Sequence, residues 1–336
     1  MSTPHHSEDR EGQSAPAVPL CSIVIPVWNR QDVIRRCLDS VFAQDFDDYE
    51  VIAVDDGSED NSVAIMQSYR DPRMRILRHS ENLGVCAARG TGTEAARGEW
   101  VVYLDSDWAL EPGALTRLAS LVRRASDEVG MVGGYMRWDT GSISPTVAPP
   151  RQPFGFVEYL KWLDPGGASD CLSCRRRCIF EDDPWPTDRR WESGYFLRLA
   201  AKWKQWIVPE VLAVEYTQCA NRLTQAHSLA AERRRREMAP SLARDCEEQL
   251  EEFGRELRRY APHRYQSRLE GAAMYNFLAG KRWRGLSFAC RAWLRRPARI
   301  QLLALAIGGL IGSTFLFMLR RIAWARSFFR YCFKMR

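Results

Sequence analysis

One short stretch constrains the fold of this chain more than any other. Residues 100–104, Trp-Val-Val-Tyr-Leu, are bulky and mostly β-favouring, and Asp105 and Asp107 follow with only Ser106 between them. A run that is apolar on both faces is typical of a strand buried in a parallel sheet, and open α/β sheets bind ligands beyond the carboxyl ends of such strands. Two carboxylates at this spacing can share one divalent cation, since Mg²⁺ and Mn²⁺ favour oxygen ligands. The alternative is a polar strand end with two solvated acids.

The chain ahead of this strand alternates between short apolar runs and helical segments. The expected strands cover residues 21–26, 51–54 and 75–77, and the expected helices lie around residues 34–41, 61–69 and 85–96. We expect Gly98 to end the third helix as a left-handed cap. The order β-α-β-α-β-α-β predicts an α/β fold with a doubly wound, mostly parallel sheet and helices on both faces.

Polar residues follow three of these strands. They are Trp28-Asn29 after the first, Asp55-Asp56-Gly57-Ser58 after the second, and Asp105 with Asp107 after the fourth. In a doubly wound sheet these ends face one crevice. The turn after the first strand holds no glycine, which excludes the G-x-G-x-x-G dinucleotide fingerprint, and the chain has no G-x-x-x-x-G-K-[ST] P-loop. We therefore expect a metal, rather than a glycine-rich backbone, to hold the phosphates of a ligand.

Four motifs in this half of the chain resemble the successive signatures of family 2 glycosyltransferases of the GT-A fold. They are residues 22–29 (SIVIPVWN), 54–60 (VDDGSED), 82–89 (NLGVCAAR) and 103–107 (YLDSD). The resemblance covers residues 20–220, strongly as far as residue 125 and more loosely beyond. It implies an inverting transfer of a sugar from a nucleotide-diphosphate donor.

The resemblance also assigns roles to individual residues of the donor site. Asp56 would accept a hydrogen bond from the base of the nucleotide, and the loop at residues 26–28 would pack on that base. Asp105 would lie near the ribose, and Asp107, with Asp105, would hold Mn²⁺ or Mg²⁺ on the diphosphate. The implied substrate-binding set is Pro26, Val27, Trp28, Asn29, Asp55, Asp56, Arg89 and Asp105.

A second acidic site is expected near residue 192. The sequence from Arg190 to Ala200 resembles the family's Glu-Asp motif, which opens a helix and precedes an arginine, here Arg198. This chain departs from the motif, because Trp191 occupies the usual Glu position and Glu192 the usual Asp position. Glu192 is therefore the expected catalytic base, and Asp188 is its nearest rival. The alternative for Glu192 is a solvated acid, or a charge at a helix start that the helix dipole favours.

Three further predictions concern the middle of the chain. Residues 109–123 are expected to form a helix with Pro112 in its first turn, and residues 131–136 a strand. The proline-rich residues 139–155 are expected to form a loop over the active site or near the acceptor. The cysteines at 171, 174 and 178 have no matching Cys or His pair, so we expect buried structural thiols rather than a zinc site.

The C-terminal part of the chain has a different character. No acidic residue follows Glu270, while 13 Lys and Arg do. Residues 300–319 form a run of 20 uncharged residues, which is long enough to span a bilayer. Basic residues flank both ends of this run. A helix that lies in the membrane interface or re-enters it suits this pattern best; a spanning helix and a buried core helix are the alternatives. The predicted organisation is a disordered lead (1–19), the GT-A domain (20–225), a helical appendage (226–298) and a basic, membrane-associating tail (299–336).

Together these features predict a metal-dependent inverting glycosyltransferase. It would act on a glycan or lipid-linked acceptor at the cytoplasmic face of a membrane with an anionic surface, and would contribute to a cell-surface or extracellular polysaccharide. No apolar leader is apparent in residues 1–19, so the thiols are expected to be reduced. The alternative is a catalytically weak nucleotide-sugar-binding scaffold of the same fold. Nucleic acid is not an expected partner, because the basic tail surrounds an apolar run that suits lipid better.

Overall fold

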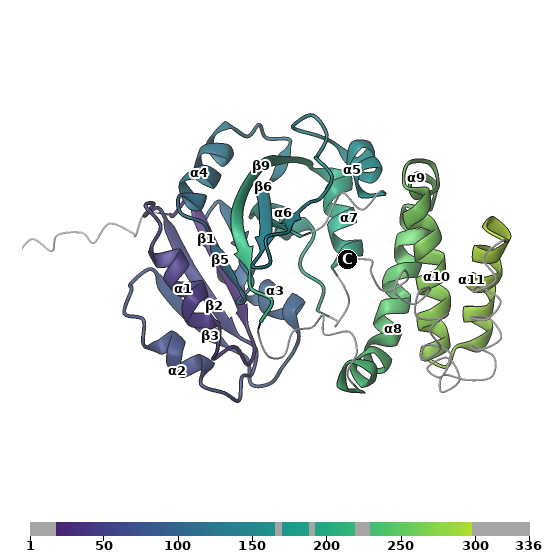
Figure 1. Cartoon of the computed structure of the whole chain (residues 1–336), viewed down its shortest axis with the longest axis horizontal. Coiled ribbons are helices and arrows are strands. Elements are labelled where there is room, and N and C mark those ends of the chain that lie inside the picture. The colour runs from purple at the N-terminus through teal and green to yellow at the C-terminus, as the bar shows by residue number, and fades with distance from the viewer. Residues whose placement is uncertain (1–17, 165–169, 188–191, 219–228, 298–336) are drawn as a thin grey trace, which may run out of the picture.

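The protein is built around one mixed sheet. The computed structural model describes residues 18–164, 170–187, 192–218 and 229–297. Within them nine strands form a sheet of order β3-β2-β1-β4-β8-β6-β9-β5, with β7 paired to β6 (Figure 1). The strands are β1 Cys21–Val27, β2 Tyr49–Asp55, β3 Met74–Arg78, β4 Trp100–Tyr103, β5 Trp108–Leu110, β6 Val129–Trp138, β7 Ile143–Ser144, β8 Cys171–Arg176 and β9 Lys204–Glu215.

The first half of the sheet confirms the predicted topology. β1, β2, β3 and β4 pair in parallel, and the crossovers contain α1 (Ile34–Phe42), α2 (Ser62–Gln67) and α3 (Val85–Ala95). Side chains of α1 and α4 (Ala114–Arg124) pack on one face of the sheet, while α3, α6 (Ile179–Asp182) and α7 (Ser193–Lys202) pack on the other. The α/β fold with helices on both faces is therefore present.

Gly98 does not have the predicted conformation. Ala96 caps α3 in an extended conformation, and Gly98 is not among the described residues with positive φ. A Cβ at Gly98 would lie 2.7 Å from the backbone nitrogen of Ser22, so the glycine lets the chain pass close to β1. The prediction of a left-handed cap was wrong, because close approach rather than backbone conformation requires glycine at this position.

The second half of the sheet contains antiparallel pairs, and one helix next to it begins later than the sequence predicted. β8 runs antiparallel to both β4 and β6, and β5 runs antiparallel to β9. Residues 108–110, expected in part to be helical, form β5, and α4 begins only after Gly113, whose φ is +75°. The partner of β5 lies at residues 213–215, a long-range pairing that local periodicity does not reveal.

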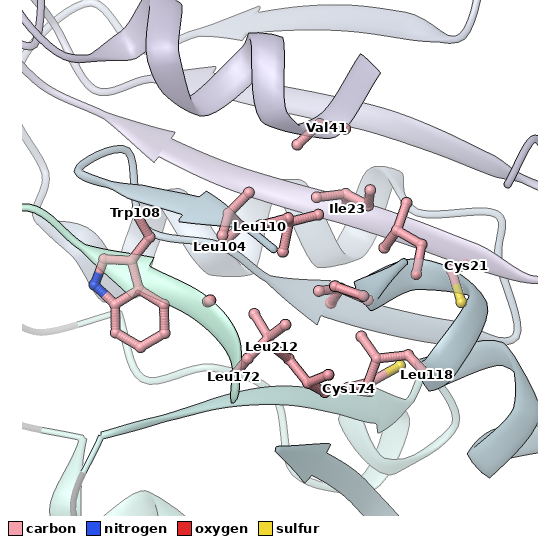
Figure 2. Close-up of a cluster of buried hydrophobic side chains, with 14 of the residues drawn as sticks. Cys21, Ile23, Val41, Leu104, Trp108, Leu110, Leu118, Leu172, Cys174 and Leu212 are labelled. Atoms are coloured by element: carbon pink, nitrogen blue, oxygen red, sulfur yellow. The ribbon is translucent and has the colours of Figure 1, made fainter. Parts of the chain in front are cut away.

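One hydrophobic core joins the two halves of the sheet. Figure 2 shows Ile23 of β1, Leu110 of β5, Leu118 of α4, Leu172 of β8 and Leu212 of β9 in the same cluster. All five side chains are at most 5% exposed. Because burial of a side chain of this size contributes roughly 1.5–3 kcal/mol, this core holds the ends of distant strands in a fixed relation.

Glu50 anchors α3 to the parallel strands. Its buried carboxylate accepts hydrogen bonds from Ser22 Oγ (2.7 Å), from the backbone N–H of Arg97 (2.7 Å) and from Arg75 Nη2 (2.9 Å). Arg75 also donates to the carbonyl of Ala95 at the end of α3. Burial alone would raise the pKa of Glu50, but these bonds outweigh it and hold the pKa below its usual range.

We expect Glu50→Gln to lower the free energy of unfolding at pH 7 by about 2 kcal/mol, since charged hydrogen bonds to partly exposed arginines are lost. A carboxylate with a lowered folded pKa stabilises the protein above its unfolded pKa of 4.5, and this contribution disappears as pH falls through the folded value. Urea unfolding of variant and wild type at a series of pH values should therefore give curves that converge below about pH 4.5. Glu94→Gln, at an exposed position on α3, is the control and should show no such dependence.

Four helices form the end of the described chain: α8 (Leu229–Glu252), α9 (Gly254–Tyr260), α10 (Pro262–Leu278) and α11 (Arg282–Arg295). Figure 1 shows α8, α10 and α11 side by side, next to α7. No helix in the described part of the chain is sufficiently long and apolar to cross a bilayer. The apolar run at residues 300–319 lies outside the described residues.

The three clustered cysteines are not equivalent. Cys174 is buried, Cys171 is half-buried and Cys178 is exposed, so the prediction of buried thiols was wrong for Cys178. Cys178 lies in the turn between β8 and α6, where its side chain has left the sheet. Within the described residues no three His, Cys, Asp or Glu side chains are grouped as metal ligands.

Candidate functional site

The ends of β1 and β2 are joined by hydrogen bonds. The backbone N–H of Asp56 donates to the carbonyl of Val27 (2.7 Å), and the N–H of Asn29 donates to Ser58 Oγ (2.9 Å). Asn29 has a φ of +51°, a conformation that asparagine tolerates better than most residues. Pro26 and Val27 lie buried within β1, whereas Trp28 and Asn29 are half-buried, so only the last two present substantial surface at the strand end.

Asp55 and Asp56 are both buried but have different partners. Asp55 accepts from the N–H of Ser58 (3.2 Å) and from Arg78 Nε (3.1 Å). Asp56 accepts from the N–H groups of residues 83 (2.9 Å) and 84 (2.8 Å) and lies 2.8 Å from Nδ1 of His79. A carboxylate has about four lone-pair positions, so Asp56 keeps capacity for another donor while it holds the loop before α3.

Arg89 of α3 connects two acidic residues from distant parts of the sequence. Nη2 of its guanidinium donates to Asp105 Oδ1 (2.6 Å), and Nη1 forms an ion pair with Glu192 Oε1. The guanidinium lies 5.5 Å from the ring centroid of Trp185, and only 8% of Arg89 is exposed. Burial alone would lower the pKa of Arg89, but the carboxylates of Glu192 and Asp105 raise it above its usual range. The residue is therefore a permanent cation between two carboxylates.

Asp105 and Asp107 lie in the turn after β4, as the sequence predicted. The N–H of Trp108 donates to the carbonyl of Asp105 (2.9 Å), and the N–H of Tyr216 donates to the carbonyl of Asp107 (3.0 Å). The Asp105 side chain remains 38% exposed while it pairs with Arg89. These contacts fix the backbone of the turn from both sides and leave carboxylate oxygens at the carboxyl end of a buried strand.

The donor atoms in this turn fit a hard divalent cation. Mg²⁺ and Mn²⁺ in nucleotide sites usually take one or two carboxylates and complete their coordination with substrate phosphates and water. Asp107 and Asp105 are the residues that would hold such an ion.

Glu192 caps the start of α7 with its backbone, not with its side chain. Its carbonyl accepts from the N–H of Phe196 (2.8 Å), and no side-chain capping bond is present. The carboxylate instead reaches Arg89. Arg198, the motif's arginine, lies near Glu248 (3.8 Å) and Glu252 (3.7 Å) of α8 rather than near Glu192. Trp191 and the rival base Asp188 lie outside the described residues.

With this geometry established, comparison with known proteins identifies the domain. Residues 22–183 match the model of glycosyl transferase family 2. These residues, just under half of the chain, are similar to that family. Among curated relatives, YibD of Escherichia coli K12, an uncharacterised glycosyltransferase, is 39% identical over 161 residues, which are 46% of this chain and 44% of YibD. The chain covers 33–40% of the length of five other curated relatives.

Two solved structures of glycosyltransferases resemble the fold over most of this chain. TarS of S. aureus in complex with UDP-GlcNAc is 15% identical with a TM-score of 0.56, and the match covers 86% of this chain and 84% of that one. The mannosyltransferase PcManGT of Pyrobaculum calidifontis, in complex with GDP-Man and Mn²⁺, is 19% identical with a TM-score of 0.51, and the match covers 96% and 89%. The predicted GT-A fold is therefore confirmed.

Two residues of the glycosyltransferase domain escaped the sequence analysis. His79 joins Asp56 to Thr91 of α3, with His79 Nε2 2.9 Å from Thr91 Oγ1. Trp185 donates from Nε1 to the hydroxyl of Tyr103 (2.9 Å) and lies against Arg89. His79 lies three residues before the start of the 82–89 motif, and this position was the available signal in the sequence. Trp185 lies in a tryptophan-rich region, and no spacing distinguishes it from its neighbours.

Proposed function

We propose that this protein transfers a sugar from a nucleotide-diphosphate donor to a hydroxyl group of a glycan or lipid-linked acceptor, with inversion at the anomeric carbon. The observation that carries the proposal is the Arg89 junction, which places Asp105 and Glu192 on neighbouring nitrogens of one guanidinium. A direct displacement needs a base beside the attacking hydroxyl and, on the other side of the sugar, a group that stabilises the leaving diphosphate. Glu192 would serve the first role and the turn with Asp105 and Asp107 the second.

In this mechanism the chain's residues have separate tasks. Trp28, Asn29 and Asp56 bind the nucleotide base, and Asp105 positions the ribose. Glu192 accepts the proton of the acceptor hydroxyl through a carboxylate oxygen as that hydroxyl attacks the anomeric carbon. A divalent cation on Asp107 and Asp105 would supply neutralisation of the charge that develops on the departing diphosphate. Arg89 holds Asp105 and Glu192 in a fixed relation.

A thermal-shift panel tests this function directly. The probes are UDP, UDP-GlcNAc, GDP and GDP-Man, because the structurally similar glycosyltransferases were solved with UDP, UDP-GlcNAc and GDP-Man, each with Mn²⁺, with Mg²⁺ and with EDTA. A ligand at 100 times its Kd stabilises the native state by about 2.7 kcal/mol. We expect one nucleotide series to raise Tm, and more so with metal. No shift with any of these ligands would contradict the proposal.

Hydrolysis separates the enzyme from the alternative of a binding scaffold. Water can replace the acceptor hydroxyl, so an active transferase releases nucleotide slowly from its own donor. Sustained release of UDP or GDP in the presence of Mn²⁺ supports the proposed reaction. Binding without any release, either alone or with added oligosaccharide or polyprenyl phosphate acceptors, would favour the scaffold that the Trp191-Glu192 departure suggests.

We further propose that the enzyme works at the cytoplasmic face of an anionic membrane through its C-terminal tail. The 13 basic residues after Glu270, with no acid among them, favour an anionic surface, and residues 300–319 supply apolar area. Trp283 and Leu294 of α11, 80% and 73% exposed, add apolar side chains just ahead of the tail.

We expect deletion of residues 299–336 to move the protein from the membrane fraction to the soluble fraction, because the basic and apolar contacts with lipid are lost. Nucleotide binding in the thermal-shift assay should persist. Alkaline carbonate extraction of the full chain then separates the two membrane modes: release is expected for a helix in the interface, whereas complete resistance would indicate a spanning helix. Unchanged fractionation after the deletion would overturn the role of the tail.

A further inference from the structure

A network of buried polar side chains joins the C-terminal helices to the start of α7. We infer that Asp245 and Gln249 of α8 and Arg268 of α10 are positioning residues, which hold Ser193 and thereby orient the adjacent Glu192 toward the reacting centre. The inference rests on the proposed role of Glu192 as the base. It makes the C-terminal helices part of the catalytic apparatus and not only a packing appendage.

The contacts converge on one hydroxyl group. Ser193 Oγ donates to Asp245 Oδ2 (3.2 Å), while Gln249 Nε2 donates to Asp245 Oδ2 (2.8 Å) and lies 3.2 Å from Ser193 Oγ. Arg268 Nη1 donates to the same hydroxyl at 3.4 Å. Asp245, Gln249 and Arg268 are 3%, 1% and 7% exposed. A buried network of this kind fixes geometry, because Asp245, Gln249 and Arg268 each lose the hydroxyl of Ser193 if α7 shifts.

Gly194 allows α7 and α8 to come this close. A Cβ at this position would lie 2.5 Å from Asp245 Oδ1 and 3.3 Å from Gln249 Cγ. The carboxylate of Asp245 therefore lies directly against the first turn of α7, where the helix dipole favours a negative charge. The first turn of α7 and the middle of α8 are therefore closely packed against each other.

The rest of α7 is held by the same helices. Arg198 lies within 4 Å of carboxylates of Glu248 and Glu252, and Leu197 is buried in a cluster with Phe253 and Leu257. On its other side, Glu192 forms the ion pair with Arg89 of α3, which packs on the sheet. Glu192 thus stands between two anchors, and a shift of α8 relative to the sheet would move its carboxylate.

Stability alone does not explain this arrangement. Buried ion pairs and polar networks often stabilise a protein no more than apolar packing of similar volume would. Misplacement of a catalytic group by about 1 Å, in contrast, can reduce a rate by about 10²-fold. Asp245 is buried beside the first turn of α7, next to the proposed base Glu192, and is therefore well placed to hold that base in position.

The test uses the full chain and five variants: Asp245→Asn, Ser193→Ala, Glu192→Gln, the double variant Asp245→Asn with Glu192→Gln, and Glu247→Gln as control. Glu247 is also on α8 and also paired, with Arg284 (2.7 Å) and Asn276 (2.7 Å), but it faces α10 and α11. The measurements are kcat and KM for nucleotide release from the donor selected by the thermal-shift panel, together with Tm.

We expect Asp245→Asn and Ser193→Ala to lower kcat about 10-fold or more with the donor KM within twofold, whereas Glu247→Gln leaves kcat within twofold even if it lowers Tm as much. In the double variant kcat should equal that of Glu192→Gln alone, because Asp245 acts only through Glu192. A further loss of more than threefold in the double variant, or equal losses for Asp245→Asn and Glu247→Gln, would overturn the inference. Full activity of Glu192→Gln would instead overturn the proposed base.

Hydrogen exchange provides a measurement that needs no turnover. Amides at residues 193–199 should exchange at least about 10-fold faster in Asp245→Asn than in wild type, since the first turn of α7 loses its anchor, while Glu247→Gln leaves them unchanged. Unchanged exchange at these amides in Asp245→Asn would refute the positioning role, whatever the activity of the enzyme.

Discussion

Glu192→Gln is expected to lower the rate of transfer at least ~10²-fold, the low end of what a general base contributes. Glutamine keeps the size of the side chain but cannot take a proton from the acceptor hydroxyl. Asp105 and Asp107, which follow β4, are not expected to replace it, because the proposed mechanism commits them to the ribose and the metal. The Kd of the donor and its dependence on Mn²⁺ should remain within about threefold of wild type, since Glu192 pairs with Arg89 and is not itself among the residues proposed to bind the base, the ribose or the metal.

The matched control for this variant is Asp188→Asn, which removes the other acid near the start of α7. We expect it to change the rate by less than about fivefold. Single-turnover rates at saturating donor, measured beside equilibrium binding of the same donor, separate the chemical step from binding. If Asp188→Asn loses the rate and Glu192→Gln keeps it, the alignment of the helix start with the family motif is wrong and Asp188 is the base.

The parallel half of the fold could be predicted from sequence because its signals are local. Strands such as β1 and β2 are apolar on both faces and end in polar loops, and their order in the chain limits the topology to few choices. β5 was missed for the opposite reason. Its three residues, Trp108–Leu110, form a strand only because β9, about a hundred residues later, pairs with them.

The candidate site likewise contains residues that local sequence predicts and contacts that depend on how distant elements pack. The sequence placed Asp56, Asp105 and Asp107 at strand ends, where each is found. The pairing of Arg89 with both Asp105 and Glu192 has no local signature, because it depends on how α3 and α7 pack against the same face of the sheet. The bonds from Asp245 to Ser193 likewise depend on which face of α8 meets α7, and the charged sequence of α8 does not reveal this.

Asp107→Ala is expected to remove the metal-dependent part of donor binding and to abolish transfer. A bound cation contributes several kcal/mol of charge stabilisation in such reactions, so the rate should fall at least ~10³-fold. In the thermal-shift assay the extra stabilisation of the UDP or GDP complex by Mn²⁺ over EDTA should disappear, while the metal-free shift should persist because the residues proposed to bind the base, at the ends of β1 and β2, are unchanged. Glu111→Ala is the matched control: it removes an acid four residues along the chain that pairs with Arg137, and it should leave the effect of Mn²⁺ unchanged.

An Asp107→Ala protein that still responds to Mn²⁺ as wild type does would show that Asp107 is not the ligand. The metal would then have to be held by Asp105, which already pairs with Arg89, or by the diphosphate alone.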